Sequence, residues 1–194
     1  MLLAGRVLFQ NSKVGGRLGG QYGMAMSGTG ESEQTLRAQE WLGASLESHV
    51  ITAAARDLYA LWRMKRSMAE FVSRRDMDIV ELSPWIGRLT VYDYIYEEDD
   101  YLCRLFGEAL RKRIGMDLTR RRFTELPAPI GERLRARYDR VRTSGLPLLC
   151  HVLTFVVELG IPQNERLPAE LLALPLSRSN CGHDCILVLH QPLD

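Results

Sequence analysis

Apolar residues between positions 50 and 62 recur at the spacing of a single helix face. The residues on this stripe are Val50, Ile51, Ala54, Leu58, Leu61 and Trp62. A period near 3.6 residues is typical of an amphipathic helix, and Arg56 and Asp57 lie away from the stripe, as a solvated face requires. The helical pattern begins at Glu31, pauses at Gly43 and resumes near Glu47. We therefore expect a helical segment ahead of the first strand.

The pattern changes after Pro84 to runs rich in aromatic and branched side chains. Residues 89–96 and 101–106 are both of this kind, which favours extended strands. The acidic run Glu97–Asp100 between them is typical of a turn. These two runs predict an antiparallel hairpin.

A second helix is indicated between Pro129 and Gly145. Its apolar stripe consists of Ile130, Leu134, Tyr138 and Val141. Gly145 suits a left-handed C-cap, and Pro147 prevents the helix from continuing. Three strand-like runs follow, at 148–159, 165–176 and 185–191.

Two strands, short helices, one longer helix and three further strands predict an α+β fold. We expect a five-stranded antiparallel sheet with the short helices and the helix 129–145 on one face. The N-terminal helix is left to cover the other face or to pair with a second copy of the chain. Of these arrangements we favour a homodimer through the helix 47–66, because pairing removes exposed Leu and Trp surface from water.

The chain divides into three parts. Residues 1–30 are rich in glycine and serine, and because such a stretch buries little surface we expect a flexible tail. Its glycines do not form a phosphate-binding loop, since no strand precedes them and no Gly-Lys-Ser/Thr follows. Residues 31–84 form the expected N-terminal helical segment, and 85–194 form the expected core.

The composition is that of an ordinary globular domain. The chain has 194 residues, of which 46% are apolar and 25% charged, and its net charge of +1 argues against a dedicated nucleic-acid binder. No run approaches the ~20 apolar residues that a membrane span needs. Cys103 and Cys150 fall inside apolar runs, where a reduced, buried thiol is usual. We therefore expect a cytoplasmic protein with no membrane partner.

The order of elements resembles that of a PAS-type sensor domain, and four short motifs resemble those of a bacterial, mainly proteobacterial, subgroup of standalone PAS-like proteins. They are Tyr59-x-x-Trp62, Arg104-Leu-Phe-Gly107, Gly115-Met-Asp-Leu-Thr119 and Leu174-Pro-Leu-Ser177. The resemblance covers roughly residues 57–190. Arg120 departs from it, because the subgroup usually has glycine there, and the proline expected before Arg74 is absent. The resemblance implies a non-enzymatic sensory domain that binds a small-molecule ligand or a protein partner in signal transduction.

Three of the motif residues suit backbone turns. Gly107 and Gly115 fit positions where a side chain would clash, and Asp117 fits an N-cap or an Asx turn. Arg104 is different, because a charge in the middle of Leu-Cys-Arg-Leu-Phe needs a partner. Either Asp93 on the neighbouring strand or an anionic ligand fulfils this requirement.

A ligand site is expected where the hairpin, the Gly115–Thr119 turn and the strand 148–157 meet. Arg104 is the candidate anchor for the ligand. Tyr92, Tyr94 and His151 are candidates for its wall, and strand alternation leaves open which of them points inward.

No cofactor is favoured by the remaining residues. Cys181, His183 and Cys185 form only part of a zinc site, which normally has four ligands. A haem would need one of the four histidines as its axial ligand, and these are His49, His151, His183 and His190. No nucleophile and base stand at a known spacing, so we do not expect an enzyme. The alternatives to a sensor are a structural adaptor whose core is filled by its own side chains and a metal- or haem-binding sensor.

Overall fold

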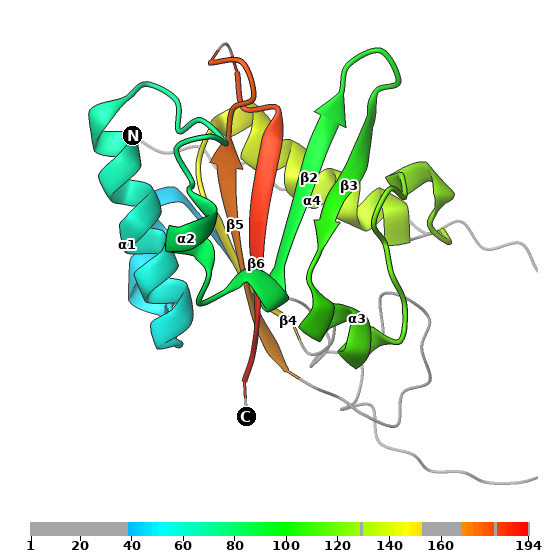
Figure 1. The fold of residues 1–194 in the computed structure, drawn as a ribbon, viewed down its shortest axis with the longest axis horizontal. Helices are drawn as coiled ribbons and strands as arrows, with labels where there is room; N and C mark the ends of the chain where they lie inside the picture. Colours follow the sequence, from blue (N-terminus) through cyan, green and yellow to red (C-terminus); the bar gives the residue numbers. More distant parts are fainter. Residues whose placement is uncertain (1–38, 129, 153–167, 181, 194) are drawn as a thin grey trace, which may run out of the picture.

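The computed structural model describes residues 39–128, 130–152, 168–180 and 182–193. These residues build a mixed α/β fold around one antiparallel sheet of six strands in the order β1-β4-β5-β6-β2-β3 (Figure 1). The strands are β1 (Gln39–Leu42), β2 (Leu89–Ile95), β3 (Asp100–Phe106), β4 (Leu148–Val152), β5 (Ala169–Leu176) and β6 (Cys185–Pro192). The expected tail 1–30 and most of the run 148–159 lie outside the described residues.

The sheet has one strand more than the sequence pattern predicts. Gln39–Leu42 was expected to be helical, but it pairs with β4 as an antiparallel edge strand, with Gln39 opposite His151. Tertiary contacts decide this segment, because Glu40 accepts hydrogen bonds from Arg137, at 2.9 Å, and from Arg140. Pairing with a neighbouring strand therefore overrides the weak local helical pattern.

Within the described residues, four α-helices and three short 3₁₀ helices connect the strands. The α-helices are α1 (Ala53–Met68), α2 (Ile79–Leu82), α3 (Glu108–Ile114) and α4 (Ile130–Ser144). The 3₁₀ helices are η2 (Gly43–His49), η3 (Ile86–Arg88) and η4 (Phe123–Glu125). In Figure 1, α4 crosses behind the sheet, whereas α1 and α2 lie at the left beside β5 and β6.

The expected helix from about Glu47 to Trp62 is displaced along the chain. Residues 43–49 form η2, and α1 begins only at Ala53, where the side chain of Thr52 caps it by accepting from the amide of Ala55. None of the helices in the described ranges is long and apolar enough to cross a membrane.

The sheet carries a hydrophobic core on each face. On one face, α3, η4 and α4 cover a cluster rich in aromatic rings that includes Tyr92, Tyr101 and Tyr138. On the other face, Leu58 and Trp62 of α1 are buried against the sheet, and the indole of Trp62 donates to the carbonyl of Pro175 at 3.0 Å. Much of the apolar stripe that we assigned to a homodimer through 47–66 is thus packed within the chain, and the homodimer stays a prediction.

Candidate functional site

The structure does not bring the predicted ligand residues together. Tyr92 and Tyr94 belong to the core cluster under α4, whereas Arg104 bonds to Asp93, which alternates with them on β2 and faces the opposite side. His151 lies on β4, separated from β2 by β5 and β6, with its Nε2 3.3 Å from Glu170. The predicted pocket between hairpin, turn and strand 148–157 is therefore not formed by these four side chains.

A β-bulge in β3 sets the direction of Arg104. Tyr92 pairs with Cys103, but the preceding residue of β2, Val91, pairs with Leu105. Arg104 is thus the extra residue of the bulge, and bulges commonly re-aim a side chain. Its Nε donates to Oδ2 of Asp93 at 2.7 Å, so the cross-strand partner weighed from the sequence is the one that the structure contains.

Two further arginines converge on the same carboxylate. Asp93 is only 2% exposed, and a guanidinium nitrogen of Arg74 lies 3.5 Å from its Oδ1. Arg178 lies 3.8 Å from Oδ2 of Asp93 and also binds Asp184, through Nε at 3.0 Å. Three cations therefore meet two carboxylates, and this group of five side chains carries a net charge of +1.

The arginines remain open to solvent although their shared carboxylate is buried. The exposed fractions of the side chains are 46% for Arg74, 43% for Arg104 and 32% for Arg178. Apolar surface lies on the same face of the sheet, because Trp85 and Leu105, the residue after Arg104 on β3, pack against the core cluster of this face and are only partly buried. The arrangement is suited to contact an external anionic group.

A second polar group lies inside the molecule, under α4. Thr90 and His190 are both buried, and the hydroxyl of Thr90 lies 3.0 Å from Nε2 of His190. The hydroxyl of Tyr92 lies beside Thr90, but none of the described residues gives it a hydrogen bond of ordinary geometry. A hydroxyl of this kind is costly to bury without a partner.

Burial keeps these interior groups uncharged. It lowers the pKa of His190 to about 3, with a smaller contribution from the nearby Arg137. Burial also raises the pKa of Tyr92 well above its usual range, and Tyr138 adds to this effect. At neutral pH His190 and Tyr92 are therefore neutral hydrogen-bonding groups, beside the charged and buried Arg137.

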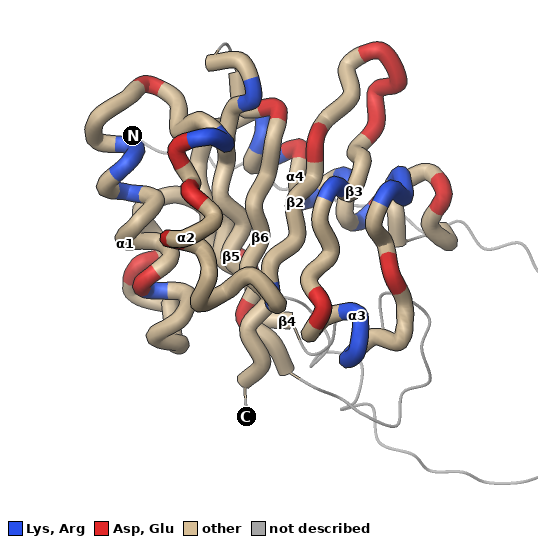
Figure 2. Tube along the Cα trace, in the orientation of Figure 1, with Lys and Arg blue, Asp and Glu red and all other residues tan. Residues whose placement is uncertain are grey.

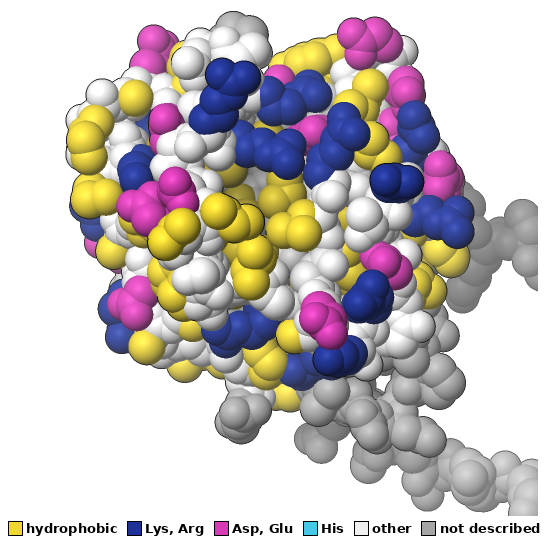
Figure 3. Space-filling model, in the orientation of Figure 1, with side chains coloured by type: hydrophobic (Ala, Val, Ile, Leu, Met, Phe, Trp, Pro, Cys, Tyr) yellow, Lys and Arg dark blue, Asp and Glu magenta, His cyan; other side chains and the backbone are white. Residues whose placement is uncertain are grey.

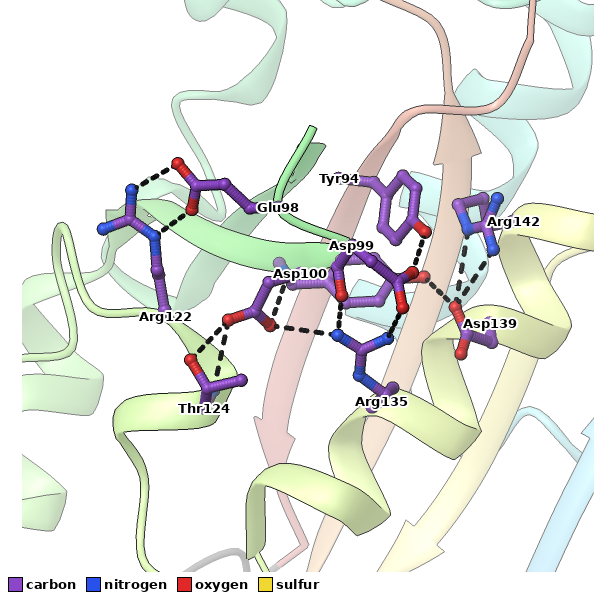
Figure 4. A network of polar contacts seen from close by, with 10 residues as sticks. Tyr94, Glu98, Asp99, Asp100, Arg122, Thr124, Arg135, Asp139 and Arg142 are labelled. Carbon is purple, nitrogen blue, oxygen red and sulfur yellow. Dashed lines mark hydrogen bonds and ion pairs between the residues drawn. The ribbon is translucent and has the colours of Figure 1, made fainter. Parts of the chain in front are cut away.

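Acidic residues at the tip of the β2–β3 hairpin fasten it to the neighbouring elements. Figure 2 shows Asp and Glu gathered at this tip. The buried Asp100 accepts from the hydroxyl of Thr124 at 2.7 Å and lies 3.6 Å from Arg135. Figure 4 shows Arg135 of α4 placed between Asp99 and Asp100. The hairpin is thereby held against α4.

Aromatic residues complete this attachment. The hydroxyl of Tyr101 donates to Asp139 of α4 at 2.9 Å, and burial followed by this carboxylate raises the pKa of Tyr101. The guanidinium of Arg142 lies 3.9 Å from the centre of the Tyr94 ring, within cation–π range. Tyr94 therefore helps to hold the hairpin against α4 and does not line an open pocket (Figure 4).

The two metal candidates that the structure describes, His183 and Cys185, have other contacts. Cys181 lies outside the described residues, His183 packs against the ring of Phe71, and Cys185 is fully buried. Burial, followed by the charge of Asp93, raises the pKa of Cys185, so its thiol is protonated at neutral pH. Within the described ranges, no three His, Cys, Asp or Glu residues are grouped so that they could hold a metal ion.

The three residues expected in turns occupy their positions for different structural reasons. Gly107 has an ordinary φ of −58°, but an added Cβ would overlap the backbone of Gly87. The clash expected at Gly115 is wrong, because no atom of the described residues lies within 4 Å of an added Cβ; Gly115 instead ends α3 with a φ of 72°, in the left-handed region that favours glycine. Asp117 accepts from the amide of Thr119 at 2.8 Å, which is the geometry of an Asx turn.

Comparisons of the chain with protein-family models, with curated proteins and with solved structures found no match. The class of protein therefore has to follow from the fold and from the two polar sites alone.

Proposed function

We propose that this chain is a non-enzymatic, PAS-like sensory domain that binds a small, uncharged polar molecule between its sheet and α4. The succession from β2 to β6 supports this proposal. Two strands, the short helices α3 and η4, the longer α4 across one face and three further strands follow each other, in the order on which the resemblance rests.

Arg120 adds support at the point where the chain departs from the subgroup. Its φ is 67°, in the left-handed region, which non-glycine residues enter at a cost of roughly 1–2 kcal/mol. The backbone conformation is therefore one that glycine favours, and glycine is what the resembling proteins usually have. The departure at Arg120 is therefore compatible with the resemblance, because the backbone there has a φ that glycine favours.

The observation that carries the proposal is the polar group under α4. Thr90, His190 and the hydroxyl of Tyr92 are sequestered from water on the helix-covered face of the sheet. A core that only had to be filled would gain stability from an apolar ring at Tyr92, because a buried, unsatisfied hydroxyl costs ~1–3 kcal/mol. A ligand with a neutral donor and acceptor would satisfy this hydroxyl.

A structural adaptor with a filled core is the second candidate. It is favoured by the close contacts between aromatic rings beside the polar group. The ring of Tyr92 lies 5.1 Å from that of Phe123 and 5.2 Å from that of Tyr138, measured between ring centres. In this case the interior is closed, and the protein acts only through its surface.

The two candidates are separated by mass spectrometry of the purified chain. Native spectra of the wild type should show a small-molecule adduct, which is then identified after denaturing extraction. Tyr92→Phe removes one interior hydroxyl without changing the ring. We expect it to reduce ligand occupancy about tenfold, which corresponds to the loss of one hydrogen bond worth ~1–1.5 kcal/mol.

Tyr59→Phe is the matched control, because Tyr59 is a buried tyrosine of the opposite core cluster. It should retain the adduct at the wild-type level. If all three proteins show only the bare chain mass, and Tyr92→Phe is as stable as the wild type or more so, the adaptor replaces the sensor.

A further inference from the structure

The part of the sheet that α1 and α2 leave uncovered combines charge with apolar surface. We call it the arginine face and define it as Arg74, Arg104 and Arg178 around Asp93, together with Trp85 and Leu105. Figure 3 shows Lys and Arg side chains gathered over the upper ends of β6, β2 and β3, with hydrophobic side chains below them over α2 and the adjoining surface. Neither the interior polar group nor α4 is part of this face.

We propose that the arginine face is a docking site for an acidic, amphipathic segment of a partner protein. Its charge is the first argument. The described residues give the side chain of Arg104 a single hydrogen bond, through Nε to Asp93, so its two terminal nitrogens are available. Planar guanidinium groups bind carboxylates through paired, charge-assisted hydrogen bonds. A carboxylate from outside would balance the excess positive charge.

The burial of Asp93 gives the cluster its rigidity. A carboxylate that is 2% exposed orients Arg104 from β3 and Arg74 from the segment after α1. The third arginine is fixed independently, because Arg178 donates to the carbonyl of Tyr94 at 2.9 Å and to Asp184. Side chains that are already ordered lose less entropy when they bind.

The apolar half of the face determines the kind of partner that it fits. Trp85 and Leu105 are half-buried, and Ile79 and Val80 of α2 and Ile86 at the start of η3 are 65%, 76% and 38% exposed. An inorganic anion or a nucleic acid would use the arginines and leave this surface in water. A protein segment that presents carboxylates next to Leu, Ile or Phe covers both halves, as anchored interfaces with a polar rim do.

The test is fluorescence anisotropy with a labelled synthetic peptide of about 16 residues, long enough to form a helix. The probe carries a stripe of Leu flanked by Glu. Two further probes replace Glu by Lys or Leu by Ser. We expect the Glu–Leu probe to bind the wild type with a Kd of about 10–100 µM and both others to bind at least tenfold more weakly. Raising the salt to about 0.5 M should weaken the binding of the Glu–Leu probe, because charge pairs near the surface are screened.

Variants locate the site. Arg74→Gln combined with Arg104→Gln should weaken binding of the Glu–Leu probe at least tenfold. The matched control is Arg113→Gln with Arg133→Gln, which removes the same charge from α3 and α4 and should leave the Kd within about twofold. Circular dichroism checks folding. If the double variant is unfolded, Arg74→Gln alone serves, because the only side-chain contact that the described residues give Arg74 is the 3.5 Å ion pair with Asp93.

Three results would overturn the proposal. Equal losses in the test and control pairs would mean a non-specific charge effect. Equal binding of the Glu–Leu and Glu–Ser probes would mean that the apolar half is not used. Displacement of the probe by millimolar inorganic phosphate at constant ionic strength would mean a small-anion site. Because the test and control variants keep every interior residue, a failure of this proposal can be distinguished from a failure of the ligand site under α4, on which it does not rest.

Discussion

Glu170 fixes the start of α1 to the sheet, and its replacement by glutamine tests whether that attachment stabilises the domain. The side chain of Glu170 is fully buried on β5. Its carboxylate accepts from the amide of Ile51 at 2.6 Å, from the amide of Thr52 at 3.0 Å and from the hydroxyl of Thr52. Because a glutamine side chain has nearly the same shape as a glutamate, any loss in the variant Glu170→Gln reflects hydrogen bonding and charge and not packing.

The magnitude follows from the number of bonds to a charged acceptor. Each such bond contributes ~1.5–3 kcal/mol, and the contributions are not additive. Glutamine keeps one carbonyl oxygen but turns an NH₂ group toward at least one N–H donor. A negative charge at the first turn of α1 also interacts favourably with the helix dipole, by ~0.3–1 kcal/mol. We therefore expect Glu170→Gln to lower the free energy of unfolding by about 2–4 kcal/mol.

Thermal and urea denaturation measure this change. For a domain of this size 1 kcal/mol corresponds to roughly 2–4 °C, so Tm should fall by about 4–16 °C. Hydrogen exchange should show faster exchange at Ile51 and Thr52, while α4 keeps its protection. Glu132→Gln, at an exposed position of α4, is the control and should change Tm by less than about 2 °C. Equal Tm values for the two variants would refute the attachment of α1 through Glu170.

Two further predictions concern His190 and Arg120. Because burial lowers the folded-state pKa of His190 to about 3, the unfolded chain binds a proton there below its ordinary pKa of ~6.5 and the folded chain does not. The stability that the neutral histidine contributes is therefore complete above about pH 6.5 and is lost as the pH falls toward 3, at up to ~1.4 kcal/mol per pH unit. In urea titrations at several pH values, the free energy of unfolding of His190→Gln should fall less steeply with decreasing pH than that of the wild type. Parallel curves would contradict a neutral, buried histidine. Arg120→Gly should raise the free energy of unfolding by about 0.5–1 kcal/mol, because glycine adopts the positive φ without strain. The control Arg121→Gly, at a position without positive φ, should lower the free energy of unfolding. A loss of stability in both variants would show that the side chain of Arg120 matters more than its backbone.

The alternation of side chains and the capping residues made most of the sheet predictable. The hairpin 89–106 follows from branched and aromatic residues around an acidic turn. The helix 129–145 follows from its stripe and from Gly145, which adopts a φ of 66° at the C-terminal end of α4. These signals are local, so the sequence contains them directly.

The predictions that were wrong concern features that depend on contacts between residues distant in the sequence. Gln39–Leu42 is only four residues long, and its state depends on the free edge of β4 and on the arginines of α4. The bulge at Arg104 cannot be read from alternation, because one inserted residue changes which face the side chain meets. The sequence pattern therefore placed Arg104 in the same pocket as Tyr92, although it lies on the opposite face.

Only part of the candidate site could be predicted from the sequence. The pair Arg104–Asp93 was weighed because the two residues lie on adjacent strands. Arg74 and Arg178 are far from each other in the sequence, and nothing local indicates that they meet at Asp93. A weak signal was available for the interior group, since His190 directly follows the apolar run Ile186–Leu189 and a polar residue there needs a partner.

Strand β2 joins the two proposed sites, because its alternating side chains serve both. Thr90 and Tyr92 face the interior under α4, whereas Val91 and Asp93 face the other side of the sheet. The bulge opposite Val91 and Tyr92 makes this stretch of the ladder irregular, and such a stretch adjusts more readily than a regular one. If a ligand that binds Tyr92 alters the position of β2, it changes the carboxylate that orients the arginines. Linkage then requires the converse, so that an acidic peptide on the arginine face changes the affinity of the interior ligand by the same factor.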